Sequence, residues 1–331
     1  KAYISKKYQV DIVSLYKTDE VPFYYLDKKI NVINVLEGDK YPLRYYFFYL
    51  KHKLKQKLKK YETDVFISAG MRYIPISIFM RKKTKYISWE HFNSAITKYG
   101  SMMWYGRKLS AKYADKFVVL TKKDRKNNIQ MFGTREDKIV QIYNPIQVVK
   151  LEGEYNKESK KIVSCGRICP QKGFDILVEV ASKVFDKHPD WEWHIYGDGE
   201  DREKIEELIK NNNLQKNVIL KGRTNKMNEL YREYAMFVLT SRYEGFAMVN
   251  IEAHFAKLPI VSFNCNCGPD EIIQDGVNGY VIDCFDKDKM AEKINFLIEN
   301  ENVRTEMSKN TILDKDKLKM ANIIKQWEKI I

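Results

Sequence analysis

The sequence predicts an α/β protein with two doubly wound domains, and three observations support this prediction. Short apolar runs alternate with segments of helical period along the chain, which is the pattern of repeated βαβ units. The length of 331 residues suffices for two such domains. A polar stretch at 147–160 has neither a helical nor a strand period, and it follows Asn144-Pro145, a pair typical of extended or turn backbone. We therefore expect domains at 1–146 and 147–314, with a final helix at 315–331.

The composition is that of a globular protein rather than a disordered one, because 44% of the residues are hydrophobic and 31% are charged. The longest apolar runs, at 45–50 and 74–80, are shorter than the ~18 residues that a membrane-spanning helix needs. No signal peptide is recognisable. The five cysteines form no paired zinc pattern, so we expect reduced thiols, no metal site and a cytoplasmic location.

Positive charge is concentrated in the first domain. Residues 1–150 hold 31 Lys and Arg against 13 Asp and Glu. Within 50–61, Leu50, Leu54 and Leu58 recur at spacings of four between lysines, which predicts a basic amphipathic helix. Such a helix suits an anionic membrane surface or an anionic substrate, and the alternative is a solvated lysine-rich face. No nucleic-acid-binding signature accompanies it, so we expect no nucleic-acid partner.

The elements of the first domain follow in order from the apolar periods. Strands are predicted at 8–17, 31–36, 64–70, 85–93, 115–121 and 138–146, and helices at 43–60, 71–81, 100–113 and 122–132. Glu90, His91 and Asn93 cluster where the strand at 85–93 ends, and doubly wound folds place function at such ends. His91 is the candidate site residue, the alternative being a structural histidine beside Trp89.

The second domain shows the same alternation. Strands are predicted at 162–166, 191–196, 217–225, 236–240, 258–263 and 280–282, and helices at 174–184, 201–212, 228–235, 286–299 and after Pro269. Arg167 and Lys172 follow the first of these strands. Two cations at one βα turn suit a pyrophosphate, although surface charges are the alternative. The Gly-Asp-Gly turn at 197–199 lacks the dinucleotide-binding fingerprint, which argues against a dehydrogenase.

The stretch EGFAMVNIE at 244–252 lies between two predicted strands, at the start of a helix. Glu244 falls in the loop, and Gly245 lets backbone approach a ligand closely because it has no Cβ. Glu252 lies one to two turns further on, where a half-buried carboxylate suits the two hydroxyls of a ribose. The free amides of the helix N-terminus, which favour a phosphate, are expected at Phe246, Ala247 and Met248. The alternative is a loop charge followed by a solvated helix face.

Three features together resemble the retaining glycosyltransferases of family four: the Glu-x7-Glu stretch, Gly-Arg followed by Lys-Gly at 166–173, and the run GPDEIIQDGVNG from 268. That family has the GT-B fold, two Rossmann-like domains facing across a cleft. The resemblance implies that Arg167 and Lys172 bind the donor diphosphate, Glu252 the ribose, and Glu244 and His91 the donor sugar. It also implies a possible contact of Arg223 with the base, and no metal or other cofactor.

The resemblance covers nearly all of the second half and is weaker over residues 1–150. The first strand and glycine-rich loop of the family would precede residue 1, so the sequence reads as truncated at its start. The final helix is expected to pack back on the first domain, as in GT-B proteins.

The implied activity is retaining transfer of a hexose or N-acetylhexosamine from a UDP-sugar to a lipid-linked or polysaccharide acceptor in bacterial surface glycan synthesis. The enzyme would lie peripherally on the inner face of the membrane. Two alternatives stay open: an inactive relative that binds UDP-sugar, and a soluble glycosyltransferase of the same fold that acts on a small molecule.

Overall fold

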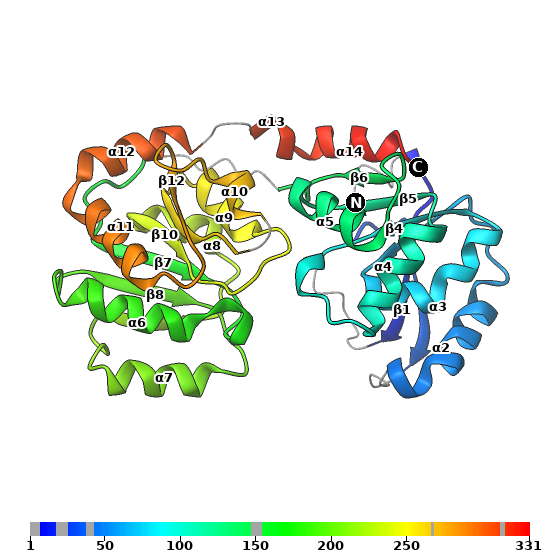
Figure 1. Cartoon of the computed structure of the whole chain (residues 1–331), viewed down its shortest axis with the longest axis horizontal. Coiled ribbons are helices and arrows are strands. Elements are labelled where there is room, and N and C mark those ends of the chain that lie inside the picture. The colour runs from blue at the N-terminus through cyan, green and yellow to red at the C-terminus, as the bar shows by residue number, and fades with distance from the viewer. Residues whose placement is uncertain (1–6, 18–25, 38–42, 147–153, 266–267, 312–314) are drawn as a thin grey trace.

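A computed structural model describes residues 7–17, 26–37, 43–146, 154–265, 268–311 and 315–331. The chain forms two lobes side by side, with the first domain at the right of Figure 1 and the second at the left. The predicted linker falls partly outside the described residues, at 147–153, as do Cys267 and residues 312–314. Over the described part of the chain, no helix is both long enough and apolar enough to cross a bilayer.

The second domain is built on a six-stranded parallel sheet in the order β12-β11-β10-β7-β8-β9. Its strands are β7 (Lys161–Cys165), β8 (Glu192–Tyr196), β9 (Val218–Gly222), β10 (Met236–Leu239), β11 (Ile260–Phe263) and β12 (Gly279–Ile282). The chain adds β8 and β9 on one side of β7 and then crosses to add β10, β11 and β12 on the other. The strand order therefore reverses between β7 and β10, where open α/β sheets bind ligands.

Helices cover this sheet on both faces (Figure 1). They are α6 (Phe174–Phe185), α7 (Arg202–Asn211), α8 (Met227–Leu230), α9 (Met248–Phe255), α10 (Pro269–Ile272), α11 (Lys287–Glu299) and α12 (Glu301–Asn310). The predicted apolar stripe of α6 is buried, from Ile176 through Val184. Burying one such side chain stabilises the fold by about 1.5–3 kcal/mol, so this stripe fixes α6 on the sheet.

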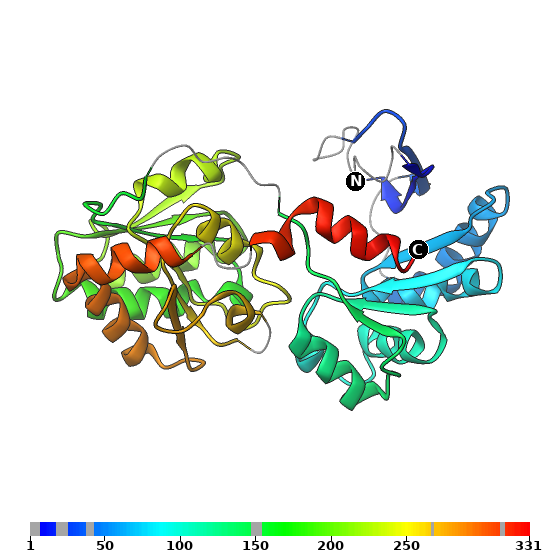
Figure 2. The ribbon, with the colours of Figure 1, turned by 90° about the horizontal axis from the view of Figure 1, so that it is seen from above.

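The first domain has a four-stranded parallel sheet in the order β3-β4-β5-β6. Its strands are β3 (Val65–Ala69), β4 (Lys85–Trp89), β5 (Lys116–Val119) and β6 (Ile139–Gln141). The two earlier strands, β1 (Asp11–Lys17) and β2 (Asn31–Glu37), form as predicted. Among the described residues they pair in parallel with each other and with no other strand, and Figure 2 shows them apart from the main sheet.

The helices of the first domain agree with the predicted periods except at 71–81. They are α2 (Leu43–Leu58), α4 (Met102–Tyr113) and α5 (Lys122–Phe132). The segment predicted as one helix is instead divided into η1 (Met71–Tyr73), α3 (Ile74–Ser77) and η2 (Ile78–Lys82). Pro75, in the first turn of α3, has no amide hydrogen, so it cannot donate the hydrogen bond that would continue a helix from η1.

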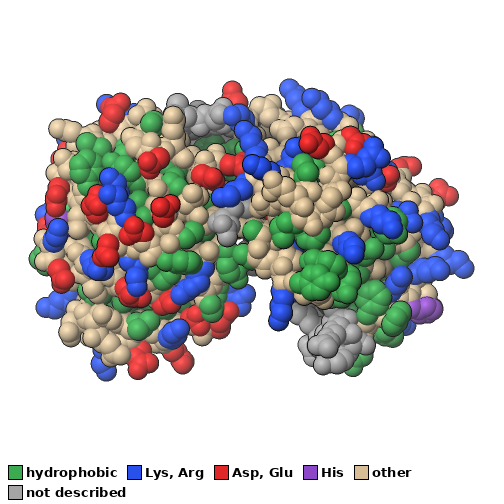
Figure 3. All heavy atoms as spheres, viewed as in Figure 1, with side chains coloured by type: hydrophobic (Ala, Val, Ile, Leu, Met, Phe, Trp, Pro, Cys, Tyr) green, Lys and Arg blue, Asp and Glu red, His purple; other side chains and the backbone are tan. Residues whose placement is uncertain are grey.

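The basic helix α2 is amphipathic as predicted. Leu50, Leu54 and Leu58 are buried in the core of the first domain. The lysines at 55, 57, 59 and 60 are exposed, and the Phe48 side chain is 82% exposed. Figure 3 shows lysine and arginine side chains scattered over the visible face of this domain with few acidic ones, whereas both signs of charge are frequent on the other.

The last helices, α13 (Lys315–Leu318) and α14 (Met320–Glu328), return from the second domain to the first (Figure 2). The apolar face of α14 packs Ile323 and Trp327 against Ile87 of β4 and Val118 of β5. The Trp327 ring also meets Trp89 edge-on, with ring centroids 4.9 Å apart. The C-terminal helix is therefore part of the first domain's core, although it follows the second domain in sequence.

Candidate functional site

Two loops meet where the strand order of the second domain reverses. Lys172 follows β7 and Glu244 follows β10, and the two side chains form an ion pair, with Lys172 Nζ 2.7 Å from Glu244 Oε1. The same carboxylate oxygen accepts a hydrogen bond of 2.6 Å from the Ser241 hydroxyl. The side chains of Lys172 and Glu244 are only 16% and 7% exposed. A largely buried ion pair therefore occupies the position where this fold class binds ligands.

The two loops are fixed to one another by further contacts. Arg242, in the loop after β10, binds both carboxylate oxygens of Asp175 at 2.8 and 2.7 Å. Gly173 has a φ of +65°, and a Cβ there would lie 2.2 Å from the Thr240 carbonyl oxygen. Only glycine fits this left-handed position and close approach. Lys172 and Glu244 are thus held by a rigid frame rather than by mobile loops.

Glu252, on α9, completes this cluster from the side of the helix. Burial raises the pKa of Glu252, while a hydrogen bond from the Tyr231 hydroxyl and the charge of Lys172 lower it. Lys172 therefore interacts with two carboxylates, Glu244 and Glu252. We call Lys172, Glu244 and Glu252 the switch-point cluster. A lysine paired with Glu244 and within electrostatic reach of Glu252 can turn to a phosphate when one arrives, because an ammonium group is a compact charge on a flexible stem.

The start of α9 differs from the prediction by two residues. Phe246 and Ala247 precede the helix, which begins at Met248 with Ala247 as its N-cap. Of the three amides expected at the helix N-terminus, only that of Met248 belongs to it. The reason is packing, since the buried Phe246 ring stacks on Tyr143 of the first domain, with centroids 5.1 Å apart. This contact holds the preceding segment in a non-helical conformation.

The two predicted arginines lie outside the switch-point cluster. Arg167 is 71% exposed and pairs with Glu200, with Nη2 3.0 Å from Oε2. Arg223 is 78% exposed, and its Nε lies 3.4 Å from Asp198 Oδ2. Exposed pairs of this kind contribute only about 0–1 kcal/mol. Both side chains can therefore leave their partners at little cost, but the structure does not bring them to Lys172.

His91 lies where the two domains touch. Its ring packs on Trp89 with centroids 4.3 Å apart, and burial lowers the pKa of the imidazole, which is therefore neutral at pH 7. Its carbonyl faces Gly245, because a Cβ on Gly245 would lie 2.1 Å from the His91 oxygen. This packing on Trp89 is the structural role that the sequence left open. The same residue also joins the first domain to the Glu-x7-Glu stretch.

A second pair of contacts ties the domains together near His91. Glu271 of α10 accepts hydrogen bonds from the Lys123 amide at 3.1 Å and from the Tyr143 hydroxyl at 2.8 Å. Sequence reasoning missed Tyr143, Ser241 and Tyr231. The partners of Tyr143 and Tyr231 are distant in the sequence. A serine three residues before a glutamate, as Ser241 is, carries no specific signal for a site. Figure 3 shows the lobes in contact at the middle, with an open cleft below that contact in this view.

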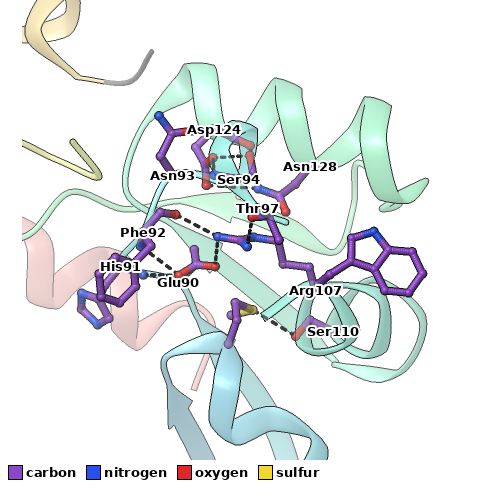
Figure 4. Close-up of polar contacts among 12 residues, drawn as sticks. Glu90, His91, Phe92, Asn93, Ser94, Thr97, Arg107, Ser110, Asp124 and Asn128 are labelled. Carbon is purple, nitrogen blue, oxygen red and sulfur yellow. Dashed lines mark hydrogen bonds and ion pairs between the residues drawn. The ribbon is translucent and has the colours of Figure 1, made fainter. Parts of the chain in front are cut away.

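The other polar residues singled out near His91, Glu90 and Asn93, are buried and belong to the same loop. Glu90 forms an ion pair with Arg107, with Oε2 2.6 Å from Nη2, and both side chains are at most 1% exposed. Figure 4 shows His91 on the far side of Glu90 from Arg107. Among the described residues, no group of three or more His, Cys, Asp or Glu side chains could hold a metal ion.

Comparison with protein families identifies both halves of the chain. Residues 147–314 match the family model described as Glycosyl transferases group 1, and residues 1–150 match Glycosyltransferase Family 4. An uncharacterized glycosyltransferase of Haemophilus influenzae is 28% identical over 100% of this chain and 93% of its own length. The amylovoran biosynthesis glycosyltransferase AmsD of Erwinia amylovora is 27% identical over 98% of this chain and 91% of its own.

Solved structures share the architecture. A TarM mutant of S. aureus, in complex with fondaparinux, alpha-GlcNAc-glycerol and UDP, superposes with a TM-score of 0.76 at 27% identity. That match covers 85% of this chain, which spans 58% of the TarM chain. Sucrose-phosphate synthase of Thermosynechococcus elongatus, at 15% identity, has a TM-score of 0.83 over 99% of this chain and 90% of its own, and shows the fold alone. The chain therefore belongs to glycosyltransferase family 4 and has the GT-B fold that the sequence predicted.

Proposed function

We propose that this glycosyltransferase moves a hexose or N-acetylhexosamine from a UDP-sugar to a lipid-linked or polysaccharide acceptor, with retention of the anomeric configuration, in the synthesis of a bacterial surface glycan. The switch-point cluster is the observation that carries the proposal, since it offers a buried cation and two carboxylates at the ligand position of the fold. The UDP in the TarM complex supports the nucleotide, and the name of AmsD supports the pathway class.

Each residue has a role in this proposal. Lys172 leaves Glu244 and binds the donor diphosphate, joined by Arg167 swinging in from Glu200. The amide of Met248, at the start of α9, adds a donor to the same phosphates. Glu252 accepts hydrogen bonds from the ribose hydroxyls. Stabilising the negative charge that develops on the departing diphosphate lowers the barrier to transfer.

The remaining contacts of the proposal involve the sugar and the base. Glu244, released from Lys172, hydrogen-bonds the donor sugar, and His91 approaches that sugar from the first domain. Arg223 reaches the base after leaving Asp198. The acceptor hydroxyl attacks from the face of the leaving phosphate, which takes its proton, so no side-chain base and no metal is part of the proposal.

The acceptor side of the proposal rests on charge. The excess of lysine and arginine in residues 1–150 and the exposed lysines of α2 suit an anionic lipid surface that presents the acceptor. Sedimentation with vesicles tests this part. We expect binding to vesicles containing anionic lipid, weakened by salt, and none to neutral vesicles. If the same small fraction of the protein sedimented with anionic as with neutral vesicles, the result would contradict this part and favour an acceptor in solution.

Thermal unfolding with and without UDP tests the nucleotide site. A ligand at 100 times its Kd stabilises the folded state by about 2.7 kcal/mol, which raises the melting temperature measurably. We expect UDP to protect the wild type and Lys309→Ala, a variant of an exposed residue that pairs with Glu306 in α12. Glu252→Ala and Arg167→Ala should lose the protection. Full protection of both variants by UDP would show that UDP binds elsewhere. A separate assay of UDP release from UDP-sugars distinguishes a transferase from a protein that only binds them.

A further inference from the structure

Arg107 is a buried cation, and among the described residues its ion-pair and hydrogen-bond acceptors lie in one short loop. It sits in the middle of α4 and is 0% exposed. Its guanidinium pairs with Glu90 at 2.6 Å, donates to the Phe92 carbonyl at 3.3 Å and donates to the Thr97 hydroxyl. These acceptors span residues 90–97, which we call the β4 loop (Figure 4). One side chain thus fixes both ends of the loop that follows β4.

Glu90 connects Arg107 to the backbone of His91. Its second oxygen, Oε1, accepts hydrogen bonds from the amides of His91 at 2.8 Å and Phe92 at 2.9 Å. The carboxylate therefore links the guanidinium to the backbone of His91 and Phe92, the two residues that lie against Gly245. Hydrogen bonds in which one partner is charged are the stronger kind, so this connection is stiff.

A second carboxylate fixes the middle of the same loop. Asp124, in the first turn of α5, accepts hydrogen bonds from the Ser94 amide at 2.8 Å and from the Ser94 hydroxyl. Asn93 Oδ1 accepts from the Ala95 amide at 2.8 Å. Four backbone amides of the β4 loop, at residues 91, 92, 94 and 95, are thus bonded to side-chain acceptors.

The outer side of the β4 loop has no room to move toward the second domain. A Cβ at Gly245 would lie 2.1 Å from the His91 oxygen and 3.3 Å from the Phe92 Cα. If the loop moved one ångström toward the second domain, it would clash with Gly245 of the Glu-x7-Glu stretch. If it moved one ångström away, the contact of His91 with Gly245 would be lost. The inner charges therefore set the distance between His91 and Gly245.

Stability alone does not explain the buried cluster of Arg107, Glu90 and Asp124. Removing two charges from water costs several kcal/mol, and well-packed apolar residues often stabilise a core as well or better. The cluster also holds two carboxylates for one arginine, and burial raises the pKa of both Glu90 and Asp124. Its distinctive result is geometric, since it fixes a loop of irregular backbone at the domain contact.

We propose that Arg107 is a positioning residue for glycosyl transfer, which acts through Glu90 to hold His91 and the β4 loop against Gly245. This inference rests on the proposed function, because it assigns the loop to the approach of the first domain to the donor. Arg107 itself touches neither donor nor acceptor. Its loss lowers the rate of transfer and leaves UDP binding unchanged, since the switch-point cluster belongs to the second domain.

The test compares Arg107→Met with three other variants of the full chain. Arg304→Met is the matched control, because Arg304 is 3% exposed and bonds Tyr155 Oη at 3.0 Å and the Lys157 carbonyl at 2.7 Å, away from the site. Glu90→Gln combined with Arg107→Met removes the unpaired buried carboxylate. Arg107→Lys keeps the charge but cannot reach all the acceptors of the guanidinium. The readouts are melting temperature, the Kd for UDP, and kcat and KM for UDP release from a panel of UDP-sugars.

We expect both single methionine variants to melt earlier than the wild type and to bind UDP within about twofold of it. The double variant should regain melting temperature, while its kcat stays about 10-fold to 100-fold below wild type, the loss that a misplacement of about one ångström causes. Arg107→Lys should lie between, and Arg304→Met should keep its kcat. A double variant with wild-type kcat, or equal losses of kcat in Arg107→Met and Arg304→Met, would overturn the proposal.

Amide hydrogen exchange separates this inference from the proposed function. Peptides covering the β4 loop should exchange faster in the double variant than in the wild type. Their exchange rate in Arg304→Met should equal that of the wild type. Unchanged exchange in the double variant would overturn the inference even if UDP binds. Absence of UDP binding by the wild type would instead overturn the proposed function, and the exchange data would still decide whether Arg107 holds the loop.

Discussion

The two domains place a buried cation in different settings. Lys172 is 16% exposed, pairs with Glu244 and acts electrostatically on Glu252, beyond the carboxyl ends of the central strands of the second domain's sheet. Arg107 is 0% exposed, and its acceptors lie in one loop of the first domain. A cation beyond the strand ends can exchange its partners for those of a ligand. A cation enclosed by its acceptors can only maintain geometry, so burial and the distribution of partners separate a binding site from a support.

The largest effect is expected at the switch-point cluster. Lys172→Met removes the cation that we assign to the diphosphate and leaves the Glu244 carboxylate without its ion-pair partner. Losing one partner of a buried, hydrogen-bonded charge pair costs about 2–5 kcal/mol, so UDP affinity should fall by about 30-fold or more. Isothermal titration with UDP measures this.

Lys183→Met is the control for Lys172→Met, because Lys183 is 47% exposed on α6 and pairs with Asp288, away from the switch-point cluster. It should bind UDP as the wild type does. A Lys172→Met protein with UDP affinity within about threefold of wild type would remove the distinction between the two clusters, since neither cation would then bind a ligand.

A smaller effect is expected from the pH dependence of the first-domain cluster. Burial raises the pKa of Glu90 to about 7 from 4.5, although Arg107 and the amides of Phe92 and His91 lower it, and Asp124 raises it further. The folded state therefore binds a proton that the unfolded state releases at lower pH. The stabilisation by this proton is complete below pH 4.5 and is lost as the pH rises through about 7.

Melting curves of Glu90→Gln between pH 5 and 8 measure this effect, because glutamine does not titrate. The stability of Glu90→Gln relative to wild type should rise across that range by about 2–3 kcal/mol, at about 1.4 kcal/mol for each pKa unit. A difference in stability that does not change with pH would mean that Glu90 is ionised throughout and that Arg107 outweighs its burial.

The smallest effect is expected at Arg223. Its side chain is 78% exposed and pairs with Asp198, so Arg223→Ala should change the free energy of unfolding by less than about 0.5 kcal/mol. UDP affinity should fall a few-fold if the guanidinium contacts the base. Urea unfolding and UDP titration of the same preparation measure both quantities. Unchanged affinity would exclude Arg223 from the donor site and leave the switch-point cluster intact.

The sequence predicted the second domain more fully than the first. Apolar runs and the stripe of α6 located the parallel sheet, because burial on both faces gives strands a continuous apolar character. The spacing of Glu244 and Glu252 and the cation at Lys172 pointed to one crevice, and the strand order brings them together.

Other features depended on contacts between distant segments. Arg107 follows no pattern that distinguishes it from a solvated helix arginine, because its acceptors come from a loop ten or more residues away. The start of α9 was misplaced because the Phe246 ring packs on Tyr143 across the domain contact. A local period carries no information about either contact, and both bear on how the domains meet.

A crystal structure with UDP tests the central claim most directly. The account predicts the diphosphate at Lys172 Nζ, with the Lys172–Glu244 contact of 2.7 Å broken, and the ribose hydroxyls at Glu252. UDP bound away from these three side chains, or bound while Lys172 and Glu244 stay paired, would contradict it.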